Sequence, residues 1–164
     1  MASTEAHIRR SPTTDVDGRA PPPSLIYVLG RVDQGIRREL RRRLGPFELS
    51  VPEFTALSIL ARRPQLSNAQ LGRRTMISPQ AMLESLGKLE ARGLVRRRTD
   101  PEHGRILRAE LTRQGRRLIA KAEAVAQEIQ DDLFDGLPDE TQRLLLDALL
   151  VAMQRLRSGL GDQH

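Results

Sequence analysis

Residues 67–111 restrict the possible folds more than any other part of this 164-residue chain. Ser67 and Ser78 each precede a short segment that reads as a helix start, because a serine side chain can accept a hydrogen bond from the first turn. Gly93 suits the end of the second segment, since glycine accepts the left-handed conformation that closes many helices. We therefore predict two consecutive short helices joined by a tight turn at residues 75–77.

Two strand-like runs, Leu94 to Thr99 and Ile106 to Leu111, follow these helices. Apolar and polar side chains alternate along each run well enough for a strand. A loop that contains a proline and a glycine separates the two runs. The order helix, turn, helix, strand, loop, strand is the layout of a winged helix-turn-helix, in which one helix enters a DNA groove and the loop, called the wing, lies beside it. The expected fold class is mainly α with a small β wing.

Long helical segments flank this unit on both sides. Apolar residues recur every three to four positions from Ser24 to about Leu44, from Thr112 to Leu133 and from about Asp139 to Arg157. A further helix should open at the capping box of residues 50–53 and stop before Pro64. One winged unit cannot bury all of these apolar stripes, so we expect N- and C-terminal dimerisation helices; a monomeric helical bundle is the alternative.

These assignments divide the chain into three parts. We expect a flexible tail over 1–23, a single domain over 24–157 and a flexible C-terminus over 158–164. Within the domain, the dimerisation helices occupy 24–48 and 112–157. The winged DNA-binding region occupies 50–111.

Basic charge is concentrated on the predicted winged unit. Residues 62–117 hold 14 Arg or Lys and 5 Asp or Glu, whereas residues 118–164 hold 4 and 9. A localised basic surface favours a polyanionic partner, because each phosphate that it neutralises releases counterions. An arginine-rich composition would not by itself produce this asymmetry, so we expect double-stranded DNA as the partner. The same charge disfavours a winged helix that docks on a neutral protein surface.

Other classes of protein are disfavoured by what the chain lacks. It has no cysteine, which excludes thiolate chemistry, and its three histidines fall in the tails or in a loop, which leaves no candidate for a buried base. Asp100, Glu102 and His103 are better explained as solvated charges than as metal ligands. We therefore expect no enzymatic activity, no cofactor and no metal. No apolar run approaches the roughly 18 residues of a membrane span, and the N-terminus lacks the apolar core of a signal peptide, so we expect a cytoplasmic protein without membrane contact.

The second helix of the predicted pair carries the candidates for reading DNA bases. Met82, Leu86 and Leu89 share one face and should pack inward, which leaves the opposite face exposed. Arginines in the preceding helix, the first strand and the wing add candidates for phosphate or minor-groove contacts. Arg105 could enter a narrow minor groove, pair with Asp100, or do both. The predicted DNA-binding residues are Ser78, Gln80, Leu83, Glu84, Lys88, Arg73, Arg74, Arg98 and Arg105.

Residues 89–118, LEARGLVRRRTDPEHGRILRAELTRQGRRL, resemble the signature of the MarR family of bacterial transcriptional regulators. The matching positions are Leu89, Glu90, Gly93, Leu94, Val95, Arg97, Asp100, Arg105, Leu111, Thr112 and Gly115. The flanking helices also fit, so the resemblance covers about residues 24–157. It implies a homodimer that binds a pseudo-palindromic operator near the regulated gene, often to repress it. Leu83 and Glu84 depart from the residues common in the family, which implies an operator unlike the common ones. His103 and Gly104 depart from the usual wing residues, which implies weaker charge pairing within the loop.

The same resemblance implies an effector, often aromatic or phenolic, that enters the crevice between the dimerisation and DNA-binding regions and releases DNA. Tyr27, Phe47 and Phe54 are the candidates for lining that pocket; the alternative is that Phe47 and Phe54 belong to the core. We therefore expect a sequence-specific DNA-binding repressor that a small effector relieves. The alternative is an architectural DNA-binding protein with little sequence preference and no effector.

Overall fold

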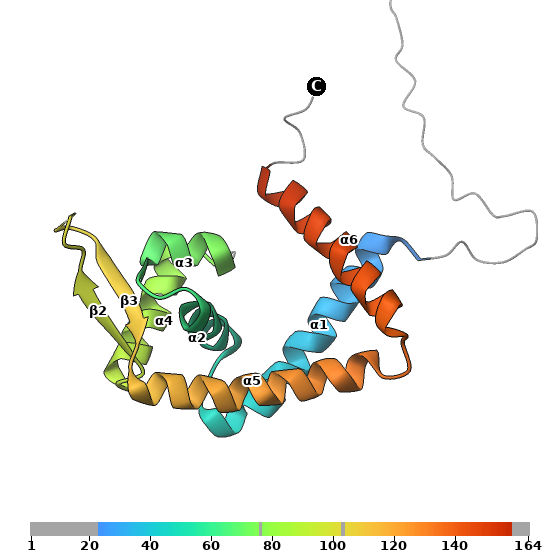
Figure 1. Cartoon of the computed structure of the whole chain (residues 1–164), viewed down its shortest axis with the longest axis horizontal. Helices are drawn as coiled ribbons and strands as arrows, with labels where there is room; N and C mark the ends of the chain where they lie inside the picture. The colour runs from blue at the N-terminus through green and yellow to red at the C-terminus, as the bar shows by residue number, and fades with distance from the viewer. Residues whose placement is uncertain (1–22, 76, 103, 159–164) are drawn as a thin grey trace, which may run out of the picture. The chain divides into compact units, whose positions relative to one another are not determined.

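The computed structural model describes residues 23–75, 77–102 and 104–158. Residues 1–22 of the predicted tail, Met76 of the turn, His103 of the wing and residues 159–164 of the predicted C-terminal tail lie outside the described residues. The chain divides into two compact units, Met1–Arg37 and Arg38–His164, which are described separately. The elements are α1 (Leu25–Leu44), a 3₁₀ turn (Gly45–Phe47), α2 (Val51–Arg62), β1 (Leu66–Ser67), α3 (Asn68–Thr75), α4 (Pro79–Ala91), β2 (Val95–Thr99), β3 (Leu107–Leu111), α5 (Arg113–Phe134) and α6 (Asp139–Ser158) (Figure 1). This order confirms the mainly α fold with a small β wing.

Side-chain caps fix where the helices of the second unit begin. Ser50 accepts a hydrogen bond from the backbone N–H of Glu53 at 3.4 Å, and the Glu53 carboxylate accepts one from the Ser50 N–H at 2.8 Å. This reciprocal pair satisfies two backbone donors that a helix start leaves without partners. Ser67, Ser78 and Thr112 cap α3, α4 and α5 in a similar way. The helix starts predicted from these residues are confirmed.

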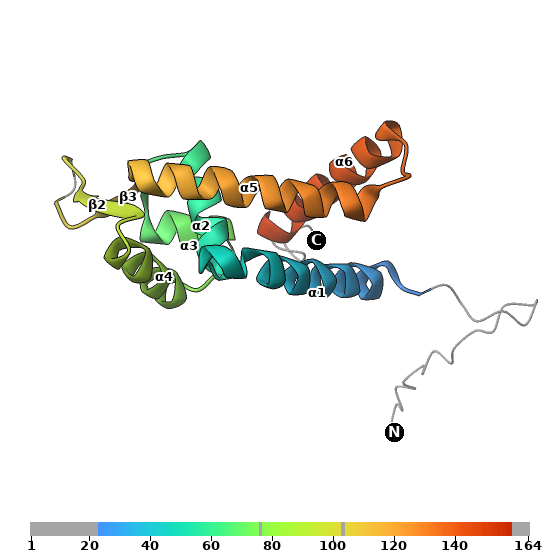
Figure 2. The same ribbon diagram turned by 90° about the horizontal axis from the view of Figure 1, so that it is seen from below.

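The wing is part of a three-stranded antiparallel sheet in the order β1-β3-β2. Val95 faces Leu111 and Thr99 faces Leu107, so β2 and β3 pair along their whole length. The third strand, β1, was not predicted, because two residues are too few to show an alternating pattern. Figures 1 and 2 both show the β2–β3 hairpin at one end of the winged unit, beside α4.

A leucine-rich core holds α2, α3, α4 and the sheet together. Its side chains with a relative exposure of 2% or less include Leu44, Leu57, Leu60, Leu71, Met82, Leu86, Leu89, Leu94, Val95 and Leu111. Met82, Leu86 and Leu89 are therefore buried as predicted, and they fix the rotation of α4 about its axis. That rotation determines which residues of α4 meet solvent.

The first turn of α5 is locked against the end of the α4–β2 connection. The Thr112 N–H donates to the Leu94 carbonyl at 3.0 Å, and a Cβ atom on Gly115 would lie only 2.0 Å from the same oxygen. Only glycine fits so close an approach of two backbones. The base of the wing and the start of α5 are thus one rigid junction, from which α5 runs away from the hairpin (Figure 2).

Apolar side chains remain exposed in both units. In the first unit they lie on the described part of α1, at Leu25, Ile26, Tyr27, Val28, Leu29 and Val32. In the second unit most of them lie on α6, at Leu144, Leu145, Leu146, Leu149, Leu150, Val151, Met153 and Leu156. None of the residues of α6 is buried. Among the described helices, none combines the length and the apolar character needed to cross a membrane.

Candidate nucleic-acid interface

The solvent-facing side of α4 carries the residues predicted to read bases. Gln80, Leu83, Glu84 and Lys88 are exposed, and Ser78 is exposed at the helix start. Leu83 is 49% exposed, although the leucines of the opposite face are buried. Polar, acidic, basic and apolar side chains therefore stand together on one helix face, which is the mixture that contacts base edges in a major groove.

A groove joins this helix face to the wing. Its volume is about 360 Å³, and it is lined by Ser67, Asn68, Ala69, Leu83, Leu86, Arg97, Arg105, Ile106 and Leu107. It brings together Leu83 of α4 and Arg105 of the wing, two of the predicted DNA-binding residues. The start of α3 completes it, so all three parts of a winged helix-turn-helix border one surface depression.

Two ion pairs hold the wing in place. Arg97 of β2 pairs with Glu90 in the last turn of α4, and Arg108 of β3 pairs with Asp100, which is 3% exposed. Arg108 also donates to the Gln65 carbonyl at 3.0 Å. The proposed pairing of Asp100 with Arg105 is therefore corrected: among the described residues, the arginine paired with Asp100 is Arg108. The reason is geometric, since Arg108 lies within the paired strand next to the loop.

Arg105 and Arg98 keep exposed guanidinium groups near the wing. Arg105 is exposed and lines the groove. Arg98 is 66% exposed and lies 3.5 Å from Glu110, which also pairs with Arg96 at 2.6 Å. Arg96 and Arg98 reach the same Glu110 carboxylate while Arg97 pairs with Glu90, because alternate side chains of a strand point to opposite faces of the sheet. A carboxylate shared by two arginines leaves positive charge available to a phosphate.

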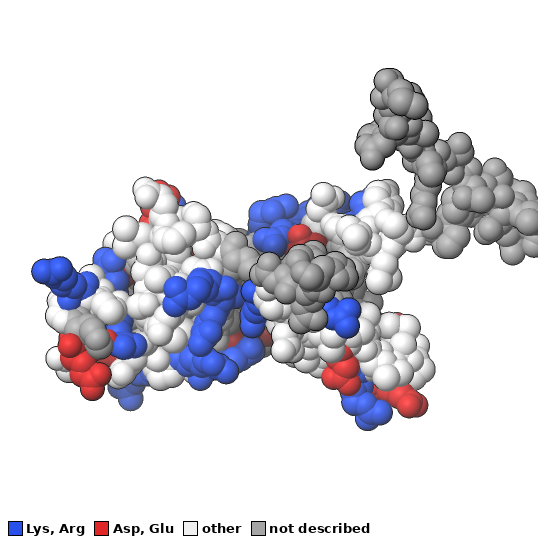
Figure 3. Space-filling view, turned by 90° about the horizontal axis from the view of Figure 1, so that it is seen from above, with Lys and Arg blue, Asp and Glu red and all other residues white. Residues whose placement is uncertain are grey.

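The two arginines at the end of α3 are both exposed, but they do not line the α4–wing groove. Arg74 lines a different pocket, with Ile59, Arg62, Arg63 and Arg157. These residues lie far apart along the chain, so their spacing could not predict that they share a pocket, and Arg63 and Arg157 were not among the predicted site residues. Figure 3 shows several separate groups of Lys and Arg side chains on the face of the molecule in view.

The candidate effector residues are distributed over three environments. Tyr27 belongs to the first unit, where its hydroxyl accepts a hydrogen bond from Arg31 at 3.1 Å. Phe47 packs against the core of the second unit. Phe54 also packs against that core, but it lines a pocket of about 460 Å³ between α2 and α5.

The lining of the α2–α5 pocket is mostly polar. It is lined by Phe54, Thr55, Ser58, Ile59, Arg62, Glu123, Ala126, Gln127 and Gln130. Within the described part of the chain, Ser58 Oγ is buried without a hydrogen-bond partner. Glu123 Oε1 is also buried and makes no hydrogen bond, but it lies 3.5 Å from Arg62 Nη2 in an ion pair. Buried polar atoms of this kind normally have partners, so the pocket offers donors and acceptors to a small ligand.

Known proteins share this architecture and much of this sequence. A MarR family model matches residues 47–106. The HTH-type transcriptional repressor Rv2887 of Mycobacterium tuberculosis is 43% identical over 126 residues, which cover 77% of this chain and 91% of that protein. The crystal structure of Rv2887 in complex with DNA superposes with a TM-score of 0.66 at 35% identity, over 80% of this chain and 98% of that one.

Two further solved structures extend the comparison. The complex of Rv2887 with salicylic acid has a TM-score of 0.66 at 37% identity and covers 82% of this chain and 99% of that one. The transcriptional regulator BldR of Sulfolobus solfataricus has a TM-score of 0.73 at 28% identity, over 80% and 93% of the two chains. The fold and the groove define a winged helix-turn-helix regulator. The chain belongs to the MarR family of transcriptional regulators.

Proposed function

We propose that this chain is a homodimeric, sequence-specific DNA-binding repressor whose operator binding is relieved by a small aromatic acid. One observation carries the DNA-binding role: Leu83 on the exposed face of α4 and the wing arginine Arg105 line the same groove. Bases would be read from α4, and Arg105 would reach the minor groove or backbone beside it. The similarity to a repressor crystallised with DNA supports this role.

The dimer is supported by the apolar surfaces that each unit leaves exposed. A helix with eight exposed large apolar side chains, such as α6, is unfavourable in water unless a partner covers it. A second copy of the chain supplies an equivalent surface, and a two-fold dimer places two α4 helices on two operator half-sites. Such a regulator works at the chromosome, so we propose a cytoplasmic location and no catalytic role.

The α2–α5 pocket is the proposed effector site. Phe54 provides an aromatic surface, and Arg62 and Ser58 provide donors suited to a carboxylate. Rv2887, the similar repressor, has been crystallised with salicylic acid and with p-aminosalicylic acid. A ligand that takes Arg62 from Glu123 would alter how α2 packs on α5, and α5 begins at the base of the wing.

A footprint on the DNA upstream of the chain's own gene, followed by a salicylate titration, tests this proposal. We expect a protected site with two-fold symmetry, and we expect salicylate to release it. Ser58→Val with Arg62→Gln should bind the site but resist salicylate, whereas the control Lys121→Gln, on the exposed side of α5, should respond normally. Equal affinity for random-sequence DNA and for the protected site would instead identify an architectural DNA-binding protein.

A further inference from the structure

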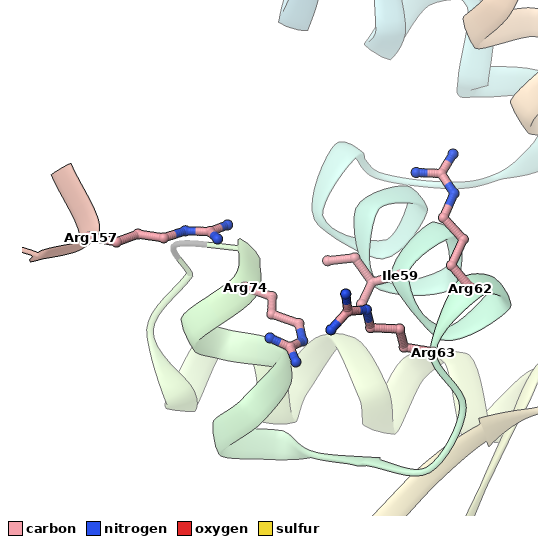
Figure 4. A pocket seen from close by; sticks show the side chains of 5 residues that line it. All are labelled: Ile59, Arg62, Arg63, Arg74 and Arg157. Atoms are coloured by element: carbon pink, nitrogen blue, oxygen red, sulfur yellow. The ribbon is translucent and has the colours of Figure 1, made fainter. Parts of the chain in front are cut away.

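A second, strongly basic pocket lies apart from the α4–wing groove. Its volume is about 320 Å³, and its lining consists of four arginines and one apolar residue, Ile59. Arg62 and Arg63 come from the end of α2, Arg74 from the end of α3, and Arg157 from the end of α6. Figure 4 shows Arg63 and Arg157 extending toward Arg74, while Arg62 points away from them. No residue of this pocket lines the α4–wing groove.

Carboxylates in the described part of the chain do not balance the charges of this pocket. Arg62 has one ion pair, at 3.5 Å from Glu123. Among the residues that the structure describes, Arg63, Arg74 and Arg157 have no carboxylate within ion-pair distance. Like charges brought together raise the free energy of the site unless an anion enters it. The arrangement is therefore better suited to a bound state with an anion than to an empty state.

The side chains indicate which anion would fit. A guanidinium group presents a planar set of N–H donors that matches two oxygens of a phosphate, and several guanidinium groups together match a multiply charged group. A single apolar lining residue gives little surface for an aromatic ring. The pocket draws on three separate helix ends and lies outside the groove, which favours a small phosphorylated molecule over the backbone of a duplex.

We propose that Arg63, Arg74 and Arg157, with Arg62 at the edge, bind the diphosphate or polyphosphate group of a small molecule. This site is distinct from the α2–α5 pocket proposed for the aromatic effector, although Ile59 and Arg62 border both. The bound anion connects the end of α3, directly before the base-reading helix, to the end of α6. Ligand binding at this site thereby restrains α3 relative to α6, in addition to neutralising the pocket.

Calorimetric titration of the full-length protein with inorganic pyrophosphate tests the proposal. We expect one site per chain, with affinity lowered about tenfold or more in the double variant Arg63→Ala/Arg157→Ala, because two charge-assisted contacts are lost. Both side chains are exposed, so the variant should fold, which circular dichroism would check. Arg63→Lys/Arg157→Lys should keep part of the affinity, since lysine retains the charge but not the paired donors.

The matched control is Arg116→Ala/Arg117→Ala, which removes the same charge from exposed positions of α5 and should bind pyrophosphate like the unmodified protein. A second titration with ADP distinguishes the sources of the diphosphate. Tighter binding of ADP supports a nucleotide ligand, and equal affinity supports an inorganic one. The proposal would be overturned if pyrophosphate affinity fell equally in both alanine variants, or if pyrophosphate did not bind to the unmodified protein. Displacement of pyrophosphate by random-sequence duplex would also overturn it, in favour of a backbone contact.

Discussion

Arg97 of β2 binds both carboxylate oxygens of Glu90 in the last turn of α4. Its backbone N–H donates to Oε1 at 3.2 Å and its Nε donates to Oε2 at 2.7 Å, with a further bond from Nη2. The guanidinium of Arg97 lowers the pKa of the Glu90 carboxyl below its ordinary value, although desolvation opposes this. The pair fixes the orientation of the wing strand relative to the base-reading helix.

Substitution Glu90→Gln should loosen this connection while leaving the core intact. Because the Glu90 side chain is 37% exposed, solvent screening limits the loss in unfolding free energy to about 1 kcal/mol or less. The loss in operator-binding free energy should exceed the loss in unfolding free energy, because the remaining Arg108–Asp100 pair does not tie the wing to α4. Urea unfolding and gel-shift titration of the same samples measure the two effects; a loss in stability alone contradicts the positioning role.

The same pair predicts a pH dependence with a definite sign. A carboxyl whose pKa is lower in the folded state stabilises the fold above its unfolded pKa, about 4.3, and loses that contribution as the pH falls through the folded pKa. The pH dependence of stability in unmodified protein should therefore be steeper below about pH 4.3 than in Glu90→Gln. Superimposable curves for the two proteins would show that Glu90 is not coupled to Arg97 in solution.

Arg105→Ala should weaken operator binding and leave the oligomeric state unchanged. Arg105 is exposed at the groove, and no ion pair holds it among the described residues, so its loss removes a contact without disturbing the fold. If it contacts a phosphate, the salt dependence of binding should become shallower by about one unit. Arg108→Ala is the contrasting variant, because it leaves the buried Asp100 carboxylate without that partner and should reduce stability. Unchanged affinity in Arg105→Ala would remove the wing from the interface.

Gln80→Ala should relax the sequence preference more than it weakens general DNA binding. A glutamine can make a paired contact with adenine, which contributes about 1–3 kcal/mol of discrimination against the wrong base. Selection from random DNA would then give a motif with one position degraded. Glu84→Gln, on the same exposed face, should instead change the preference at another position. The same motif from both variants and the unmodified protein would assign base reading to other residues.

The sequence predicted those features that depend on neighbouring residues. The capping pair of Ser50 and Glu53 could be predicted because its partners lie three positions apart. The buried face of α4 could be predicted from the helical spacing of its apolar residues. Features that depend on partners far away along the chain could not be predicted. Arg108, rather than Arg105, reaches Asp100, and Arg74 lies beside Arg157 of α6, because the tertiary fold decides these contacts. The spacing of these residues along the chain therefore could not predict either of the two contacts.

Gly115→Ala should destabilise the protein although it adds only a methyl group. That methyl would lie 2.0 Å from the Leu94 carbonyl oxygen, so either α5 or the base of the wing must move. Overpacking of this kind costs about 1–3 kcal/mol, or more where backbone must shift. Thermal unfolding measures the loss. Gly87→Ala, on α4 where a Cβ meets nothing within 4 Å, is the matched control and should be neutral or stabilising.

Leu145→Glu/Leu149→Glu should convert the proposed dimer to a monomer. Both side chains are exposed on α6, and each buried leucine would contribute about 1.5–3 kcal/mol to association. Light scattering should give twice the chain mass of 18.4 kDa for the unmodified protein and that mass once for the variant. Leu107→Glu, an exposed leucine of the wing sheet, should remain dimeric. In the unmodified protein, footprints of the two half-sites should lie about one helical turn apart, roughly 34–36 Å. A monomeric unmodified protein would contradict the dimer and this operator geometry together.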